Sequence, residues 1–296
     1  MTGSAYIVGY TATDAGADAV ALASRLARAS GGSLDLVLVL PSIERSVITP
    51  PDSGYERYLR GQADAWLDDA RGLVATGVEA RTHVRYAESF AEGLGAAAAE
   101  LGASHIVVGA ANGGLRGRHR LGTVASELLH SADVPVVLAP EGSREVDASV
   151  GVTRITAAVG NRAGADVLLE ETVALAADTG APVRLLSLVT VDLPKGVDTG
   201  AIRLAGAAHA DDVLAKASAG LPDGIAVEAT VGSGESIEDA VTGLEWLPGE
   251  LVLVGSSRLA QPRRLFLGST AAKMLHELPI PMIVVPRTRA QEGAQR

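Results

Sequence analysis

The sequence repeats itself at a nearly fixed distance, and this repeat constrains the fold more than any other feature. Val107-Val108-Gly109 recurs as Leu253-Val254-Gly255, an offset of 146 residues (255 − 109). The same offset relates Gly122-Thr123 to Gly268-Ser269 (268 − 122). Such an ungapped register predicts two tandem copies of one domain, each about half of the 296 residues.

Composition limits the kind of core and the kind of partner. The chain is 47% hydrophobic but only 3% aromatic, so its core must be mainly aliphatic. A formal net charge of −10 and a pI near 5.1 argue against nucleic acid or an anionic membrane as the main partner. The absence of cysteine from the sequence excludes disulfides, zinc thiolate sites and thiol catalysis.

The sequence carries no targeting or membrane signal. The N-terminus has no basic patch followed by an apolar segment, and no apolar run reaches 18 residues. We therefore expect a soluble, cytoplasmic protein.

Each copy alternates short apolar runs with longer amphipathic stretches. In the first copy we expect strands at 5–10, 34–40, 78–84, 105–109 and 134–139, with helices at 14–29, 55–76, 89–101 and 124–131. In the second we expect strands at 154–159, 183–189, 225–231, 250–255 and 281–285, with helices at 165–178, 201–219, 236–244 and 269–277. Near-continuous apolar strands separated by helices predict an α/β fold, with a parallel sheet covered on both faces.

The repeat also sets the expected domain bounds. The first domain covers residues 1–140 and the second covers 153–288. The charged segment 141–152 has no periodicity and is interpreted as a linker, and residues 289–296 as a polar tail.

One segment of the first copy could hold a phosphate. The strand that ends at Gly109 leads into a loop containing Asn112, Gly113 and several basic residues, and Gly122-Thr123 then opens a helix. Glycines allow close approach of the backbone to a ligand, and the free N–H groups of a helix start suit an anion. The alternative is a plain surface loop with a threonine N-cap. The loop is neither a Walker loop nor a dinucleotide fingerprint.

This pattern resembles the signature of the universal stress protein family, which has a glycine, two residues, a second glycine, nine residues, and then Gly-Ser or Gly-Thr. The match runs through Gly109, position 112 and Gly122-Thr123, and the resemblance covers both copies nearly end to end. It implies two Rossmann-like domains of the adenine nucleotide alpha hydrolase type, each a five-stranded parallel sheet with helices on both faces. It also implies a stress-response role.

Many members of that family bind ATP at the glycine loop, and others bind no nucleotide. The resemblance implies ATP or AMP as the ligand, with Mg²⁺ accompanying ATP. In the first domain the implied binding residues are Thr11, Val39, Gly109, Asn112, Gly113, Gly122, Thr123 and Val124. In the second domain they are Gly255, Arg258, Gly268 and Ser269.

This chain departs from the family pattern in both copies. The second motif glycine is replaced by Asn112, which tolerates a left-handed backbone, and by Arg258 in the second copy, which tolerates it poorly. Nucleotide-binding members carry an acidic residue at the tip of the first strand, where this chain has Thr11 and Gly160. Asp14 is a nearby substitute in the first copy. We therefore expect a weakened first site and a degenerate second one.

Two functional hypotheses remain open. In the first, the chain is a nucleotide-responsive regulatory module that binds ATP or AMP in its first domain. In the second, it is a nucleotide-independent dimerising scaffold that acts through a protein partner. No residue set resembles a nucleophile with its base, so we expect a protein that is not an enzyme and that hydrolyses ATP slowly at most.

The closing strands of the two domains predict how the copies assemble. In the family these strands commonly pair across a two-fold axis, and a tandem chain can form that pair internally. We expect residues 134–138 and 281–285 to pair antiparallel, each covering the other's exposed edge. A further homodimer of chains is also expected.

Overall fold

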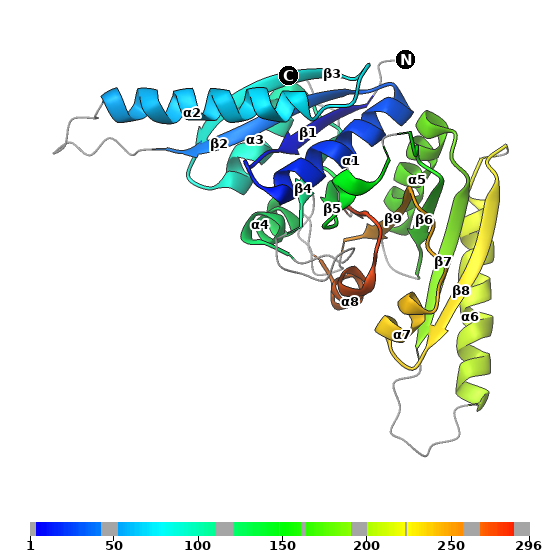
Figure 1. The fold of residues 1–296 in the computed structure, drawn as a ribbon. Helices are drawn as coiled ribbons and strands as arrows, with labels where there is room; N and C mark the ends of the chain where they lie inside the picture. Colours follow the sequence, from blue (N-terminus) through cyan, green and yellow to red (C-terminus); the bar gives the residue numbers. More distant parts are fainter. Residues whose placement is uncertain are drawn as a thin grey trace, which may run out of the picture.

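A ten-stranded sheet runs through the whole molecule (Figure 1). The structure, a computed structural model, describes residues 4–42, 53–110, 121–147, 149–160, 164–190, 200–222, 224–256 and 267–286. In this part of the chain, the first half contains β1 (Ala5–Gly9), α1 (Asp14–Ser30), β2 (Ser33–Pro41), α2 (Ser53–Gly72), β3 (Glu79–Ala87), α3 (Phe90–Leu101), β4 (His105–Gly109), α4 (Thr123–Ser131) and β5 (Val136–Ala139).

The second half repeats this order after a short 3-10 helix, η1 (Ser143–Glu145). Its elements are β6 (Arg154–Ala158), α5 (Ala165–Thr179), β7 (Val183–Thr190), α6 (Gly200–Ala219), β8 (Val227–Gly234), α7 (Ile237–Thr242), β9 (Glu250–Gly255), α8 (Ser269–Glu277) and β10 (Met282–Val285). The predicted alternation of strands and helices is confirmed in both halves, as is the α/β fold class.

The strand order is β3-β2-β1-β4-β5-β10-β9-β6-β7-β8. All pairs within each half are parallel, and β5 pairs with β10 antiparallel. Val137 lies opposite Ile283 in that central pair. The predicted pairing of the two closing strands is therefore confirmed, and it joins two five-stranded sheets into one.

Helices cover both faces of the sheet. One core packs α1, α2, α5 and α6 against the sheet, and the other packs α3, α4, α7 and α8 against its opposite face. Both cores are dominated by Val, Leu, Ile and Ala, as the composition predicts. The helices on the second face belong to one core that crosses the seam between the halves, because Leu128 of α4 and Met274 of α8 are in the same cluster.

Local sequence signals explain where several helices begin and end. Thr13 caps α1 by accepting a hydrogen bond from the Gly16 amide, and Gly31 ends the helix in a left-handed conformation (φ 64°). Ser89 caps α3 in the same way, by accepting a hydrogen bond from the Glu92 amide. These caps fix the residues at which the helices after β1 and β3 begin.

Other element bounds differ from the prediction. The helix expected at 55–76 ends at Gly72, and the strand expected at 78–84 runs to Ala87. β3 is longer than its apolar pattern because all nine of its residues pair in register with β2. Backbone pairing therefore decides its length, although several of its side chains are polar and exposed.

The linker expected at 141–152 makes specific contacts with the first domain. The Asp18 carboxylate of α1 accepts hydrogen bonds from the backbone amides of Gly142 and Arg144. The Arg144 guanidinium lies 2.9 Å from a carboxylate oxygen of Asp14. The linker is thus anchored on α1. Across the described residues, no helix is both long and apolar enough to span a lipid bilayer.

Candidate functional site

A cleft opens at the carboxyl ends of three strands in the second half. Its cavity has a volume of about 370 Å³ and lies where β6, β7 and β9 end. Gly160 follows β6, Thr190 ends β7, and Gly255 ends β9, and all three line the cavity. In an open parallel sheet this is the place where ligands bind, and the volume is within the range of small-molecule sites.

Two helix N-termini reach this cleft. Gly164, the N-cap of α5, and Gly268, the N-cap of α8, both line the cavity. Neither glycine can supply a side-chain cap, so the first backbone amides of both helices lack that partner. The positive ends of two helix dipoles therefore converge here, which favours an anionic group such as a phosphate.

The walls of the cleft are largely apolar. Leu168 of α5, Leu188 of β7, Val213 of α6, Ile237 of α7 and Met274 of α8 contribute to the lining. Such a surface suits an aromatic or aliphatic part of a ligand. The described residues that line the cavity include no Asp, Glu, Lys or Arg. Charge for a ligand therefore comes from backbone dipoles in this part of the chain.

A few polar side chains enter this apolar surface. Ser187 of β7 is only 6% exposed and lines the cavity, and within the described ranges its hydroxyl has no hydrogen-bond partner. His209 of α6 and the buried Ser256 after β9 line the cavity as well. A buried hydroxyl that faces a cavity without a partner is a natural hydrogen-bond group for a ligand.

Sequence reasoning missed Ser187 and His209. The available signal was the hydroxyl of Ser187, which lies between Leu186 and Leu188 in the strand expected at 183–189. The register-equivalent residue of the first half is Leu38. The two strands are aligned by equivalent backbone bonds, because the Tyr10 amide donates to the Val37 carbonyl and the Val159 amide donates to the Leu186 carbonyl. Both pairs differ by 149 residues (159 − 10, 186 − 37).

The corresponding place in the first half is more tightly filled. A Cβ built on Gly109 would lie 2.0 Å from the Ala15 carbonyl oxygen, whereas a Cβ on Gly255 would meet nothing within 4 Å. A Cβ on Gly9 would lie 2.6 Å from Leu94. The equivalent residue of the second half, Ala158, carries a Cβ and lines the cleft. The glycine that ends β4 therefore serves close packing against the start of α1, and the glycine that ends β9 leaves the cleft open.

The structure places most of the predicted first-domain residues near the carboxyl end of the sheet. Thr11 follows β1, and its hydroxyl lies 2.9 Å from that of Thr13. Val39 lies within β2, and Gly109 ends β4. Asn112 and Gly113 lie outside the described residues. The predicted first site therefore stays a prediction.

The helix start that follows this loop differs from one expectation. A threonine N-cap was the structural alternative for Thr123, but Gly122 is the N-cap and Thr123 and Val124 are the first two residues of α4. Gly122 has extended backbone and supplies no side-chain hydrogen bond, because it has no side chain. Thr123 is exposed, so its hydroxyl is accessible at the helix start.

The predicted binding residues of the second domain also lie partly within and partly outside the described residues. Gly255 and Gly268 line the cleft, and Ser269 is the first residue of α8. Arg258 lies outside the described residues, so its effect on the loop stays a prediction. Asp14, considered as a substitute acid in the first half, forms an ion pair with Arg144 of the linker. Its carboxylate is therefore engaged in anchoring the linker.

Among the described residues, groups that would bind a metal ion are not gathered at the cleft. Across the described ranges, no three His, Asp or Glu side chains cluster in a way that could hold a metal ion. The cleft offers hydroxyls, an imidazole and backbone amides, which can bind a ligand and orient it.

Comparison with known proteins places this architecture in a family. The model of the universal stress protein family matches residues 6–140 and again residues 151–286. Universal stress proteins of Mycobacterium tuberculosis and Mycobacterium bovis are each 29% identical to this chain, over 95% of its length and 99% of their own. A solved universal stress protein from Archaeoglobus fulgidus has a TM-score of 0.66 at 18% identity, covering 97% of this chain and 100% of that one. The solved structure supports the fold alone.

Proposed function

The chain belongs to the universal stress protein family, and from that premise we propose that it is a stress-response regulatory protein that binds an adenine nucleotide, ATP or AMP. The observation that carries the proposal is the cleft of the second half, where two helix N-termini meet beside an apolar wall. The phosphates would lie at the starts of α5 and α8, and the adenine would lie against the apolar wall.

The described residues favour the second half as the binding site. Gly255 leaves open space at the end of β9, whereas Gly109 is packed against Ala15. This reverses the preference that the glycine pattern suggested, because that pattern favoured the loop of the first half. Mg²⁺ would enter with ATP and be held by its phosphates, since no carboxylate is among the described residues that line the cleft.

The proposed role is binding rather than catalysis. His209 is the only imidazole among the described cavity-lining residues, and none of these lining residues is a carboxylate or another evident general base. Any hydrolysis of bound ATP would therefore be slow.

The alternative function is a nucleotide-independent scaffold. It is favoured by the close packing of the first half at Gly109 and by the antiparallel β5–β10 pair, which fixes the two halves as one body. A further homodimer of chains would extend that role. In this case the cleft of the second half would be a remnant and the helical surfaces would carry the function.

Calorimetric titration of ATP with Mg²⁺, and of AMP, tests these alternatives. We expect saturable binding that is lost in Gly255→Leu, a substitution for which the cleft has room, and retained in Gly122→Leu. Loss in Gly122→Leu alone would place the site in the first half. An absence of heat and of thermal stabilisation at millimolar nucleotide would reject nucleotide binding and leave the scaffold function.

A further inference from the structure

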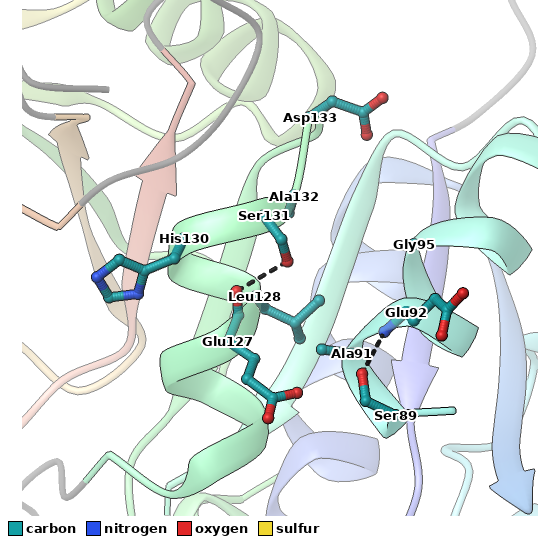
Figure 2. Close-up of a pocket in the computed structure, with 10 residues that line it drawn as sticks. All are labelled: Ser89, Ala91, Glu92, Gly95, Glu127, Leu128, His130, Ser131, Ala132 and Asp133. Atoms are coloured by element: carbon teal, nitrogen blue, oxygen red, sulfur yellow. Dashed lines mark hydrogen bonds between the residues drawn. The ribbon is translucent and has the colours of Figure 1, made fainter. Parts of the chain in front are cut away.

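A hollow of about 770 Å³ lies between α3 and α4, away from the carboxyl-end cleft (Figure 2). Its floor consists of buried core residues, Ala91, Leu128 and Ala132. On its rim, the Ser131 hydroxyl donates to the Glu127 carbonyl of its own helix (Figure 2). None of the described residues that line it has a buried side-chain polar atom without a partner. A smaller hollow elsewhere differs in this respect.

This smaller hollow lies at the seam, where α1 of the first half meets the second half. The seam hollow is lined by Leu22 and Arg25 of α1, Val152 of the linker, Gly249 before β9 and Pro281 before β10. Its volume of about 10 Å³ is that of one water-sized species. Because both halves line the seam hollow, anything that occupies it contacts both.

Arg25 brings a buried positive charge to the seam hollow. The residue is only 7% exposed. Within the described ranges its guanidinium forms neither a hydrogen bond nor an ion pair, and its Nε atom is buried without a partner. Burial lowers the pKa of Arg25, and no carboxylate of the described chain counteracts this effect. An arginine nevertheless stays protonated, so the described chain leaves a buried cation without a counterion.

The carboxylate of Glu250 lines the same hollow region but is engaged by other groups. One of its oxygens lies 2.7 Å from Arg184, and the other lies 2.8 Å from Arg154. The first oxygen also accepts a hydrogen bond from the Thr156 hydroxyl. No ion pair joins Glu250 to Arg25 among the described residues. A counterion for Arg25 therefore has to come from outside this part of the chain.

The fold of one copy does not require an arginine at this place. Gly31 and Gly180 end α1 and α5 in the same left-handed conformation, and they are 149 residues apart (180 − 31). The same offset relates Arg25 to Ala174 (174 − 25), which is exposed. The buried arginine is thus a feature of the first half that its repeat lacks.

The surroundings of Arg25 suit a small anion. Val152 and Gly249 are partly buried, and within the described chain their backbone amides donate no hydrogen bond. Guanidinium and backbone N–H groups are donors that commonly bind anions in proteins. The seam hollow has room for a single-atom ion, whereas phosphate or a carboxylate needs space for several heavy atoms.

We propose that Arg25 binds a small monovalent anion, chloride, in the seam hollow. The ion neutralises the buried guanidinium and accepts hydrogen bonds from it and from the amides of Val152 and Gly249. It thereby ties α1 to the residues that lead into β9, so the packing of the two halves depends on the ion. The site is independent of the nucleotide cleft, which lies at the opposite, carboxyl end of β9.

Chloride NMR on the full chain without nucleotide tests for the site. We expect the wild-type protein to broaden the chloride resonance, and bromide to remove this broadening by competition. The broadening should fall severalfold in Arg25→Met, because methionine keeps an apolar stem but has no donor. The matched control is Arg28→Met, which removes the same charge from an exposed position one turn along α1 and should keep the broadening. Gly255→Leu, which fills the nucleotide cleft, should keep it too.

Thermal unfolding gives an independent readout. At equal ionic strength, replacing gluconate by chloride should raise the melting temperature of the wild type by about 2–3 °C when chloride is tenfold above its dissociation constant. Arg28→Met should show the same rise. Arg25→Met should show none, and in gluconate it should be at least as stable as the wild type, because no unpaired buried charge remains.

Three results would overturn the proposal. The first is an absence of broadening by the wild-type protein, which would mean that the seam hollow holds water only. The second is an equal chloride response in the wild type and Arg25→Met, which would indicate a general salt effect. The third is a stronger response of the wild type to sulfate than to chloride at equal ionic strength, because an ion of that size does not fit the hollow.

Discussion

Gly109 and Gly255 occupy the same place in the two repeats, yet their surroundings give them different roles. Gly109 is required because the Ala15 carbonyl oxygen would lie 2.0 Å from any Cβ added there. Gly255 is exposed and faces the open cleft, with nothing within 4 Å of the same added atom. A glycine that occupies the same position in both repeats can thus allow close packing in one copy and keep a cavity open in the other.

Alanine substitution at the two glycines should separate these roles. We expect Gly109→Ala to lower the free energy of unfolding by about 2 kcal/mol, because the backbone of α1 must move to admit the methyl group. Gly255→Ala should change it by less than about 0.5 kcal/mol. Urea unfolding of both variants measures the difference, and similar losses in the two would contradict the assignment.

At the scale of elements, the amino ends of β6, β7 and β9 are joined by a buried polar cluster. Glu250 at the start of β9 is fully buried and lies 2.8 Å from Arg154 of β6 and 2.7 Å from Arg184 of β7. The Arg184 guanidinium also stacks over Trp246, 4.7 Å from the ring centroid. This cluster ties the three strands together at the end opposite to the cleft. It therefore keeps the strands in register, and their other ends shape the cleft.

Removal of the central carboxylate should therefore destabilise the second half. Glu250→Ala leaves Arg184 and Arg154 without their shared partner, and we expect a loss of about 3–5 kcal/mol in the free energy of unfolding. Glu228, 3.9 Å from Arg154 and 65% exposed, provides the control, since Glu228→Ala should cost less than about 1 kcal/mol. Equal effects in a denaturant titration would show that the buried cluster contributes no more than the surface pair.

The bounds of elements show what sequence patterns predict well and what they miss. The helix caps Thr13 and Ser89 and the stop at Gly31 are local signals, and the helices they bound lie within a residue or two of their predicted ranges. β3 runs three residues further than its apolar pattern because pairing with β2 extends it. The role of Ser187 was also missed, because a buried hydroxyl acquires significance only when a cavity lies in front of it.

At the scale of the whole molecule, the antiparallel β5–β10 pair makes one body of two domains. Residues Val136–Leu138 pair with Met282–Val284, so the closing edge of each five-stranded sheet is covered by the other. The core on the α3, α4, α7 and α8 face continues across this pair. The two halves are therefore held by both backbone hydrogen bonds and a shared apolar core.

Proline at the centre of this seam should loosen the two halves. Val137→Pro removes an amide from a strand that is paired on both sides, with a cost of about 3 kcal/mol or more. We expect faster amide hydrogen exchange in β10, while β8 at the far edge of the sheet keeps its protection. Unchanged exchange in β10 would mean that the pair does not hold the halves together in solution.

The resemblance to a known family implied the pairing of the closing strands, and the sequence by itself determined the duplication, the order of strands and helices and the aliphatic cores. These follow from local signals and from an internal repeat, which need no knowledge of distant contacts. The tertiary structure alone decided which half has an open cleft. Gly109 and Gly255 are matched positions in the repeat, and only their neighbours in space give them opposite roles. Space left in a site depends on packing between segments far apart in the chain, and no local pattern encodes it.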